Sequence, residues 1–502
     1  MNAVPPSETS LFDLRSQLES GEISSQRLVG QCLERIRAVD WNGPSIRSVI
    51  ETNPDAEAIA AELDAERRER GERGPLHGIP ILVKDNIDTA DRMRTTAGSL
   101  ALEGTYPSQD AHVASCLRRA GAILLGKANL SEWANFRSTN ASTGWSARGG
   151  QCLNPHALDR SPGGSSSGSA AAVAAGFAPA SLGTETDGSI LSPAAACGVV
   201  GIKPTVGLTG RGGVIPISHT QDTVGVFGQS VRDAAVVLGA IVGEDPRDPA
   251  TSLGASHSHS DYFPFLDDAS LQGARIGVAR EPYFTYSPKA ARVADEALAL
   301  IRDLGAVIVD PADIPTAREM EDSDAEHEVL LHEFKQGLNA YLRRRPGPGI
   351  RSLADLIRFN EAHADREMAY FGQEIFHLAQ ERGSLSDRVY RDALDKNRRL
   401  ARVDGIDAVM NRYALDALVM PTGSPAIKID LINGGRGYGG SSQPAAIAGY
   451  PAISVPAGQV SCLPVGITFM GRAWSEPTLI GFAYAFEQAA QARQAPRFVP
   501  VT

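Results

Sequence analysis

Residues 161–204 contain two glycine- and serine-rich turns, and each turn runs directly into a segment of small side chains. The first turn reads GGSSSGS before AAAVAAG, and the second reads TETDGS before ILSPAAACG. Small side chains let one backbone approach another closely, and glycine permits turns that other residues rarely adopt. Each turn brings a serine to the start of a predicted helix, where unpaired N–H groups favour negative charge. The stretch can therefore form a pocket for a developing oxyanion, although a glycine-rich loop without chemistry has the same composition.

The same stretch resembles the signature of the amidase signature family, which consists of hydrolases with a Ser–Ser–Lys triad. The KPT segment that closes the signature is present at residues 203–205. The family lysine lies upstream in a G(I/V)P…KD motif, and this chain has GIPILVKDN at residues 78–86. The resemblance implies that Lys84 is the base, Ser165 the bridging serine and Ser189 the nucleophile.

The resemblance also implies how these groups are supported. It implies a cis peptide bond between Gly164 and Ser165, and a hydrogen bond from Ser166 to Lys84. It implies an oxyanion hole made of the backbone N–H groups of Thr186, Asp187, Gly188 and Ser189. It implies no cofactor and no metal ion.

Two residues depart from the common family pattern. Asp187 stands where most members have Gly, and Leu191 stands where many have Arg. These variants resemble the peptide amidase branch, as do NLSEWANFR, GWSARGGQ and FMGRAWSEP. That likeness implies hydrolysis of the C-terminal carboxamide of a peptide to acid and ammonia. Two alternatives stay open: an amidase of small aliphatic or aromatic amides, and a glutaminase-type subunit of an amidotransferase complex, which is expected to keep Gly and Arg at these positions.

Amide hydrolysis sets a requirement on Lys84. A serine hydroxyl attacks only if a neutral base accepts its proton, so the pKa of Lys84 must fall from ~10.4 towards ~7–8. The apolar run IPILV before it predicts a buried strand and the necessary burial. Because adjacent strand residues point to opposite faces, we expect Asp85 to face away from Lys84.

The resemblance and the strand–helix alternation predict one α/β domain over residues 1–502, with a large mixed twisted sheet sandwiched between helices. We expect an N-terminal helical segment (1–75), a catalytic core (76–310), a helical cap (316–413) and a return to the sheet (414–502). The predicted strands are 48–51, 79–83, 123–125, 199–203, 275–279, 307–309, 417–420, 452–455 and 464–470.

Composition limits the class of protein. The net charge of −11 argues against a nucleic-acid partner, and no apolar window reaches the ~18 residues of a membrane span. The N-terminus shows no secretory pattern, which predicts a cytoplasmic protein. The five cysteines form no CxxC pair and are expected to be buried free thiols. We expect a monomer or homodimer that acts on a small-molecule or peptide amide.

Two other chemistries find little support. A Ser–His–Asp hydrolase would use GxSxG, which neither serine turn supplies. A metal site is suggested by His327, Glu328 and His332, but five residues turn a helix by about 500°, which separates the two imidazoles.

Overall fold

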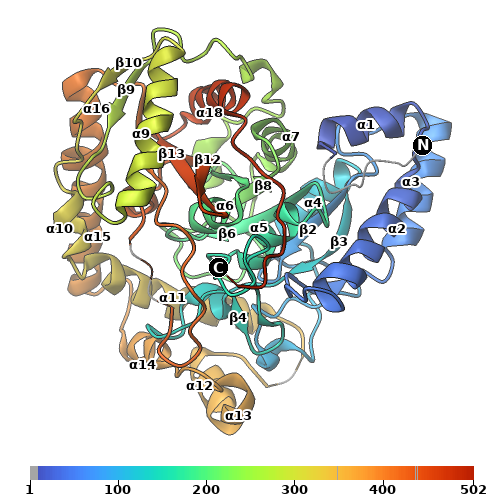
Figure 1. Cartoon of the computed structure of the whole chain (residues 1–502). Coiled ribbons are helices and arrows are strands. Elements are labelled where there is room, and N and C mark those ends of the chain that lie inside the picture. Colours follow the sequence, from blue (N-terminus) through green and yellow to red (C-terminus); the bar gives the residue numbers. More distant parts are fainter. Residues whose placement is uncertain (1–8, 348, 436, 438, 502) are drawn as a thin grey trace.

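A computed structural model describes residues 9–347, 349–435, 437 and 439–501 of the chain. An 11-stranded sheet runs through it in the order β1-β3-β2-β6-β8-β7-β12-β13-β11-β9-β10 (Figure 1). A two-stranded sheet, β4 with β5, lies apart from it. The strands are β1 (Val49–Thr52), β2 (Pro80–Lys84), β3 (Ile123–Ala128), β4 (Trp145–Ser146), β5 (Gly150–Gln151), β6 (Ala180–Glu185), β7 (Val200–Lys203), β8 (Thr223–Gly228), β9 (Arg275–Val278), β10 (Val307–Val309), β11 (Ala417–Pro421), β12 (Ala452–Val460) and β13 (Leu463–Met470).

The large sheet is mixed, which confirms the predicted α/β fold. β2 pairs in parallel with β3 and β6, and β9 pairs in parallel with β10 and β11. The strands between these two groups pair antiparallel. Both parallel groups need helical crossovers, because a parallel connection cannot be made by a tight turn.

Helices flank both faces of this sheet. In β8, Val226 belongs to a large apolar cluster with α4, α7 and α18, whereas its neighbour Phe227 packs among residues of α5 and α6. Since neighbouring strand residues point to opposite faces, these two clusters mark the two sides of the sheet. The helices outside the 316–413 region are α1 (Leu11–Glu19), α2 (Ser25–Arg35), α3 (Ala56–Arg70), α4 (His112–Arg119), α5 (Ser167–Ala174), α6 (Leu191–Cys197), α7 (Val231–Ile241), α8 (Thr251–Gly254), α9 (Pro288–Asp303), α17 (Gln443–Ala448) and α18 (Glu476–Ala490).

Short 3-10 and π-helical segments complete these elements. They are η2 (Ile36–Trp41), η3 (Leu100–Leu102), η4 (Glu132–Asn135), η5 (Phe263–Phe265) and η6 (Arg399–Ile406).

The close packing of α5 explains why the signature stretch contains small residues. All eight residues of this helix are buried, so every side of it meets protein. A Cβ atom on Gly168 would come within 2.2 Å of the Ser48 carbonyl oxygen and 2.5 Å of the Asn129 nitrogen. Only small side chains allow a helix to sit this close to its neighbours.

Two central strands, β6 and β8, were not predicted. Each of these strands contains glycine, which interrupts the apolar pattern from which a strand is predicted. The glycines are needed because neighbouring atoms approach the strand backbone closely at these positions. A Cβ atom on Gly183 would lie 2.5 Å from Phe227, and one on Gly225 would lie 2.1 Å from the Ile202 carbonyl oxygen. The predicted TETDGS turn therefore begins inside β6.

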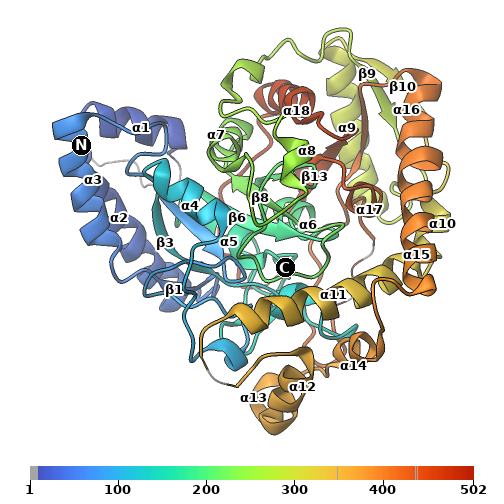
Figure 2. The ribbon, with the colours of Figure 1, turned by 180° about the vertical axis from the view of Figure 1, so that it is seen from behind.

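Helices are the only regular elements in the described part of residues 316–413, as the sequence pattern predicts. Figure 2 shows α11 lying across the lower half of the molecule, with α12, α13 and α14 beyond it. The division into four regions, and the role of this one as a cap, stay predictions. The helices are α10 (Ala317–Glu321), α11 (Ala325–Arg344), α12 (Leu353–Ala362), α13 (Ala364–Glu367), α14 (Glu374–Glu381), α15 (Arg388–Arg398) and α16 (Asp407–Tyr413).

Over the ranges the structure describes, no helix combines the length and apolarity that crossing a membrane requires. The described cysteines are free, and four of the five are buried. Residues 436 and 438, within the glycine-rich segment after β11, lie outside the described residues.

Candidate active site

The site lies where two parallel neighbours, β2 and β6, end. Val83 pairs with Leu182, so the next residue of β2, Lys84, reaches the level of Gly183 on β6, one residue before Thr184. The carboxyl ends of parallel strands meet at the same edge of a sheet, where ligand sites of α/β proteins form. Lys84 is fully buried there.

The three residues that the sequence singled out lie in one hydrogen-bonded chain. Lys84 Nζ lies 2.8 Å from Ser165 Oγ, and Ser165 Oγ lies 2.9 Å from Ser189 Oγ. Ser165 is 1% exposed and Ser189 8% exposed, so only the far end of the chain meets the surface. The peptide bond between Gly164 and Ser165 is cis.

Burial dominates the electrostatics of Lys84. Desolvation lowers the pKa of its amine to about 7, against the charges of Asp222 and Glu185, which act to raise it. Asp85 does not contribute, because its carboxyl group accepts hydrogen bonds from Thr96 and faces Arg148. The expected separation of Lys84 from Asp85 is thus present in the structure.

Thr184 and Asn86 complete the environment of the amine, and sequence reasoning missed both. Lys84 Nζ donates to Thr184 Oγ1 at 2.8 Å and to the Thr184 carbonyl oxygen at 3.2 Å. Asn86 Nδ2 donates to the same hydroxyl at 3.0 Å. Both residues stand inside the motifs, but nothing local placed Thr184, near the end of β6, beside the turn after β2 that carries Asn86.

Ser166 differs from its expected role. We expected a hydrogen bond to Lys84, but the Ser166 hydroxyl donates to the Thr184 carbonyl oxygen at 3.0 Å and accepts from the Thr184 N–H at 3.2 Å. Because it begins α5 behind β6, its side chain reaches the strand backbone first. Ser166 therefore holds Thr184, and Thr184 holds Lys84.

The turn that carries Ser189 is fixed by Glu185. Its Oε2 atom accepts hydrogen bonds from the N–H groups of Ile190 at 2.6 Å and Leu191 at 3.0 Å. Gly188 has a φ of 72°, which favours glycine, and a Cβ atom there would lie 2.8 Å from Ser442 Oγ. The Glu185 carboxylate and the glycine conformation therefore define the path of the backbone on both sides of Ser189.

The predicted oxyanion donors lie in this turn. Among the described residues, no backbone carbonyl accepts a hydrogen bond from the N–H groups of Thr186, Asp187 or Ser189. The Gly188 N–H faces the Glu185 carboxylate, whose pKa it helps to lower against the effect of burial. The oxyanion hole itself stays a prediction.

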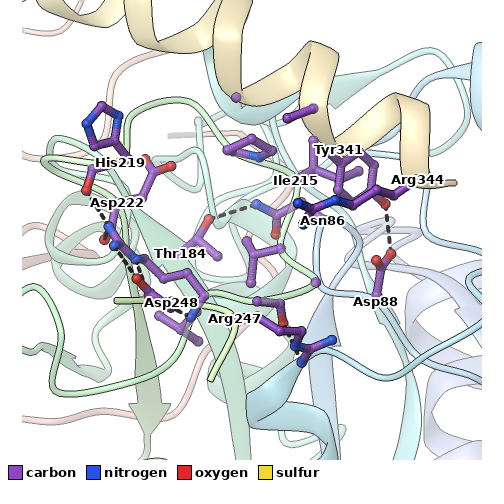
Figure 3. A pocket seen from close by; sticks show the side chains of 18 of the residues that line it. Asn86, Asp88, Thr184, Ile215, His219, Asp222, Arg247, Asp248, Tyr341 and Arg344 are labelled. Atoms are coloured by element: carbon purple, nitrogen blue, oxygen red, sulfur yellow. Dashed lines mark hydrogen bonds and ion pairs between the residues drawn. The ribbon is translucent and has the colours of Figure 1, made fainter. Parts of the chain in front are cut away.

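Two cavities flank this hydrogen-bonded chain. The smaller, about 170 Å³, adjoins the serine turns through Gly164, Leu191, Ser192 and Ser442, and its described lining has no ionisable side chain. The larger, about 520 Å³, lies on the Thr184 side of the site. Figure 3 shows Asn86 and Thr184 between Asp222 on one side and the bonded pair of Tyr341 and Asp88 on the other.

The suggested metal site is not assembled. Nδ1 of His332 lies 3.0 Å from the Glu328 carbonyl oxygen of its own helix. Nowhere in the described ranges do three or more His, Cys, Asp or Glu side chains form a group that could hold a metal ion.

Known proteins resemble the chain over nearly its whole length. The native peptide amidase from Stenotrophomonas maltophilia is 50% identical, with a TM-score of 0.93, over 98% of this chain and 99% of that one. An Arabidopsis thaliana protein described as a probable amidase is 42% identical over 98% of this chain and 92% of its own length. A glutamyl-tRNA(Gln) amidotransferase subunit from Thermoanaerobacter pseudethanolicus is 34% identical over 97% of this chain and 98% of its own.

The amidase family model matches residues 27–480, which confirms the resemblance that the signature stretch indicates. The chain therefore belongs to the amidase family and is an amidase, a hydrolase that cleaves the C–N bond of amides.

Proposed function

We propose that this amidase hydrolyses the C-terminal carboxamide of peptides, with Ser189 as nucleophile and Ser165 and Lys84 as its proton relay. The observation that carries the proposal is the chain of contacts from Lys84 through Ser165 to Ser189. The amine at its buried end has a pKa of about 7, so a large part of it is free to accept a proton at neutral pH.

Thr184 orients the neutral amine. A neutral lysine has two N–H bonds and one lone pair, and Thr184 offers two oxygen acceptors to the N–H bonds. The lone pair then faces the third neighbour, the hydroxyl of Ser165. In this arrangement Ser165 donates to Lys84 and Ser189 donates to Ser165, because hydroxyl protons rotate to suit their partners.

Acylation follows from this arrangement. Ser189 Oγ attacks the amide carbon while its proton passes to Ser165 and the Ser165 proton passes to Lys84. The carbonyl oxygen becomes an oxyanion, which we propose is stabilised by the backbone N–H groups of Thr186, Asp187 and Ser189, since the Gly188 N–H of the predicted set is engaged by the Glu185 carboxylate.

The second half of the cycle returns the protons. The C–N bond breaks as a proton moves from Lys84 through Ser165 to the nitrogen, and ammonia leaves an ester on Ser189. Water then attacks this ester with the same relay as base, and the carboxylic acid leaves.

The smaller cavity favours peptide amides among the possible substrates. Its described lining consists of glycines and of small, polar and aliphatic side chains, which suits an extended peptide. Free glutamine carries an α-carboxylate, and the described lining offers no cation to pair with it. The likeness to a peptide amidase at 50% identity supports the same choice. We propose that residues 316–413 cap the cleft and set selectivity.

The test is a substrate panel assayed for ammonia release. It contains an N-acyl dipeptide amide, benzamide, acetamide and glutamine, assayed with wild type, Ser189→Ala and the matched control Ser169→Ala. The peptide amide is expected to have the highest kcat/KM, and only Ser189→Ala should lose it. A preference for glutamine, or activity that requires a partner protein, would contradict the proposal.

A further inference from the structure

Asp187 is two residues before Ser189, and one oxygen of its carboxyl group accepts no hydrogen bond. The residue is half-buried, but its Oδ1 atom is fully buried and has no hydrogen-bond partner. The Ser442 side chain hydrogen-bonds the same carboxyl group, and Ser442 lines the smaller cavity. A buried oxygen without a donor is destabilising unless a ligand supplies one.

A hydrogen-bond network links the signature turn to α11 directly beside Asp187. Glu326 of α11 accepts hydrogen bonds at 2.9 Å from the side-chain amides of Gln221 and Gln443. Gln221 also donates to the Thr186 carbonyl oxygen at 3.3 Å, directly before Asp187. Burial and the neighbouring Glu326 raise the pKa of Asp187. Neutral or ionised, the carboxyl group keeps an oxygen that accepts.

The scissile carboxamide offers the matching donor. Its oxygen is directed to the oxyanion donors, which leaves two N–H bonds on its nitrogen that need acceptors in a dry site. An ester or a carboxylate has no hydrogen on the corresponding oxygen. A hydrogen-bond acceptor beside the scissile nitrogen therefore favours the binding of amides over that of esters and of the acid product.

We infer that Asp187 accepts a hydrogen bond from the –NH2 group of the scissile carboxamide and selects primary amides over esters. The inference rests on the proposed role of Ser189, because it places the leaving nitrogen beside that turn. The bond would hold the nitrogen with its developing lone pair towards Ser165. When the C–N bond breaks, the nitrogen takes the Ser165 proton and leaves as ammonia.

The experiment compares kcat/KM for one peptide as its primary amide, N,N-dimethylamide and methyl ester. The enzymes are wild type, Asp187→Gly, Asp187→Asn and a control at an exposed acid, Asp268→Asn. Asp187→Gly should lower the value for the primary amide by roughly tenfold to a hundredfold, the range of one hydrogen bond to a carboxylate. The ratio of the primary-amide value to the methyl-ester value should fall by the same factor, because the ester has no N–H to lose its acceptor.

Asp187→Asn keeps an oxygen acceptor and should lose less amide activity than Asp187→Gly. An equal fall for amide and ester in Asp187→Gly would assign Asp187 a purely structural role and overturn the inference. No change for either substrate would overturn it too. If neither variant folds, the wild-type series decides. The kcat/KM of each substrate is then divided by the rate constant of its hydroxide-catalysed hydrolysis, and this ratio must be at least about tenfold lower for the dimethylamide than for the primary amide.

The experiment distinguishes an error in the proposed peptide substrate from an error in the inferred role of Asp187. If the wild type hydrolyses benzamide but no peptide amide, the peptide substrate is wrong. The role of Asp187 is then judged from the ratio of benzamide to methyl benzoate turnover in the same variants.

Discussion

Replacing Lys84 with methionine should abolish turnover and also change how the stability of the protein depends on pH. Methionine has a similar length and no charge, so it fills the same buried space without a titrating group. The pKa of Lys84 falls from 10.5 to about 7 on folding, because burial disfavours the ammonium form. A shift of this size corresponds to about 5 kcal/mol.

The direction of the pH dependence of stability follows from the number of protons that the folded and unfolded chains bind. Between about pH 7 and pH 10.5 the unfolded chain binds a proton at Lys84 that the folded chain does not, so the free energy of unfolding rises with pH. The lysine therefore opposes folding by about 4 kcal/mol at pH 7 and by about 2 kcal/mol at pH 9. The methionine variant lacks this dependence.

In Lys84→Met, lost hydrogen bonds offset part of the stability gained by removing the buried amine. Methionine leaves Ser165 and Thr184 without their partner, which costs about 1–3 kcal/mol for each unsatisfied group. This loss does not depend on pH over the same range. The advantage of the variant over wild type in free energy of unfolding should thus fall by about 2 kcal/mol between pH 7 and pH 9.

The assay is urea unfolding of wild type and Lys84→Met at pH 7, 8 and 9. Lys289→Met, at an exposed position, is the matched control for losing a lysine. In parallel, the kcat/KM of wild type should rise about tenfold per pH unit below about pH 7 and level off above it, since only the neutral amine is a base. Parallel stability curves for Lys84→Met and wild type would refute the depressed pKa and the relay that needs it.

Four further changes test other parts of the structure. Ser189→Ala should lower kcat by about 10³-fold or more without changing the melting temperature by much, as measured by ammonia release and calorimetry. Thr184→Val should lower kcat about tenfold to a hundredfold at nearly constant KM, because Lys84 loses an acceptor. Asp222→Asn should move the acidic limb of the kcat/KM profile to lower pH, because the Asp222 charge raises the pKa of Lys84; an upward shift would count against this arrangement. Gly168→Ala should destabilise the protein by about 2 kcal/mol or more in urea unfolding, since its Cβ atom overlaps the Ser48 and Asn129 backbone.

The sequence was sufficient to single out the three hydrogen-bonded residues, Lys84, Ser165 and Ser189, because each lies in a local motif. Lys84 follows a run of apolar residues that predicts a buried strand, and each serine follows a glycine-rich turn. Parallel neighbours then need only meet at one edge to bring the motifs together, and β2 and β6 do so. The fold class follows from the same alternation of strands and helices.

The rest of the site depends on contacts that leave no local trace. Thr184 was hidden because β6 carries a glycine where α5 packs, so the strand resembled a turn. Glu326 lies on a helix far along the chain, in a region that reads only as amphipathic and charged. Its approach to the signature turn is visible only through Gln221 and Gln443, which no spacing rule connects with it. Long-range packing of this kind is what a pattern of single residues cannot encode.

The adjacent pair Lys84 and Asp85 shows how strand geometry permits Lys84 to act as the proposed base. If both side chains faced one cavity, the carboxylate would hold the amine protonated and the relay would fail at neutral pH. Alternation sends Asp85 to Thr96 and Arg148 on the other side of the strand. The carboxylates that do act on Lys84, Asp222 and Glu185, are themselves bound by N–H and hydroxyl donors. Desolvation therefore exceeds their attraction for the ammonium form, and the pKa of the amine settles near the pH at which a general base works best.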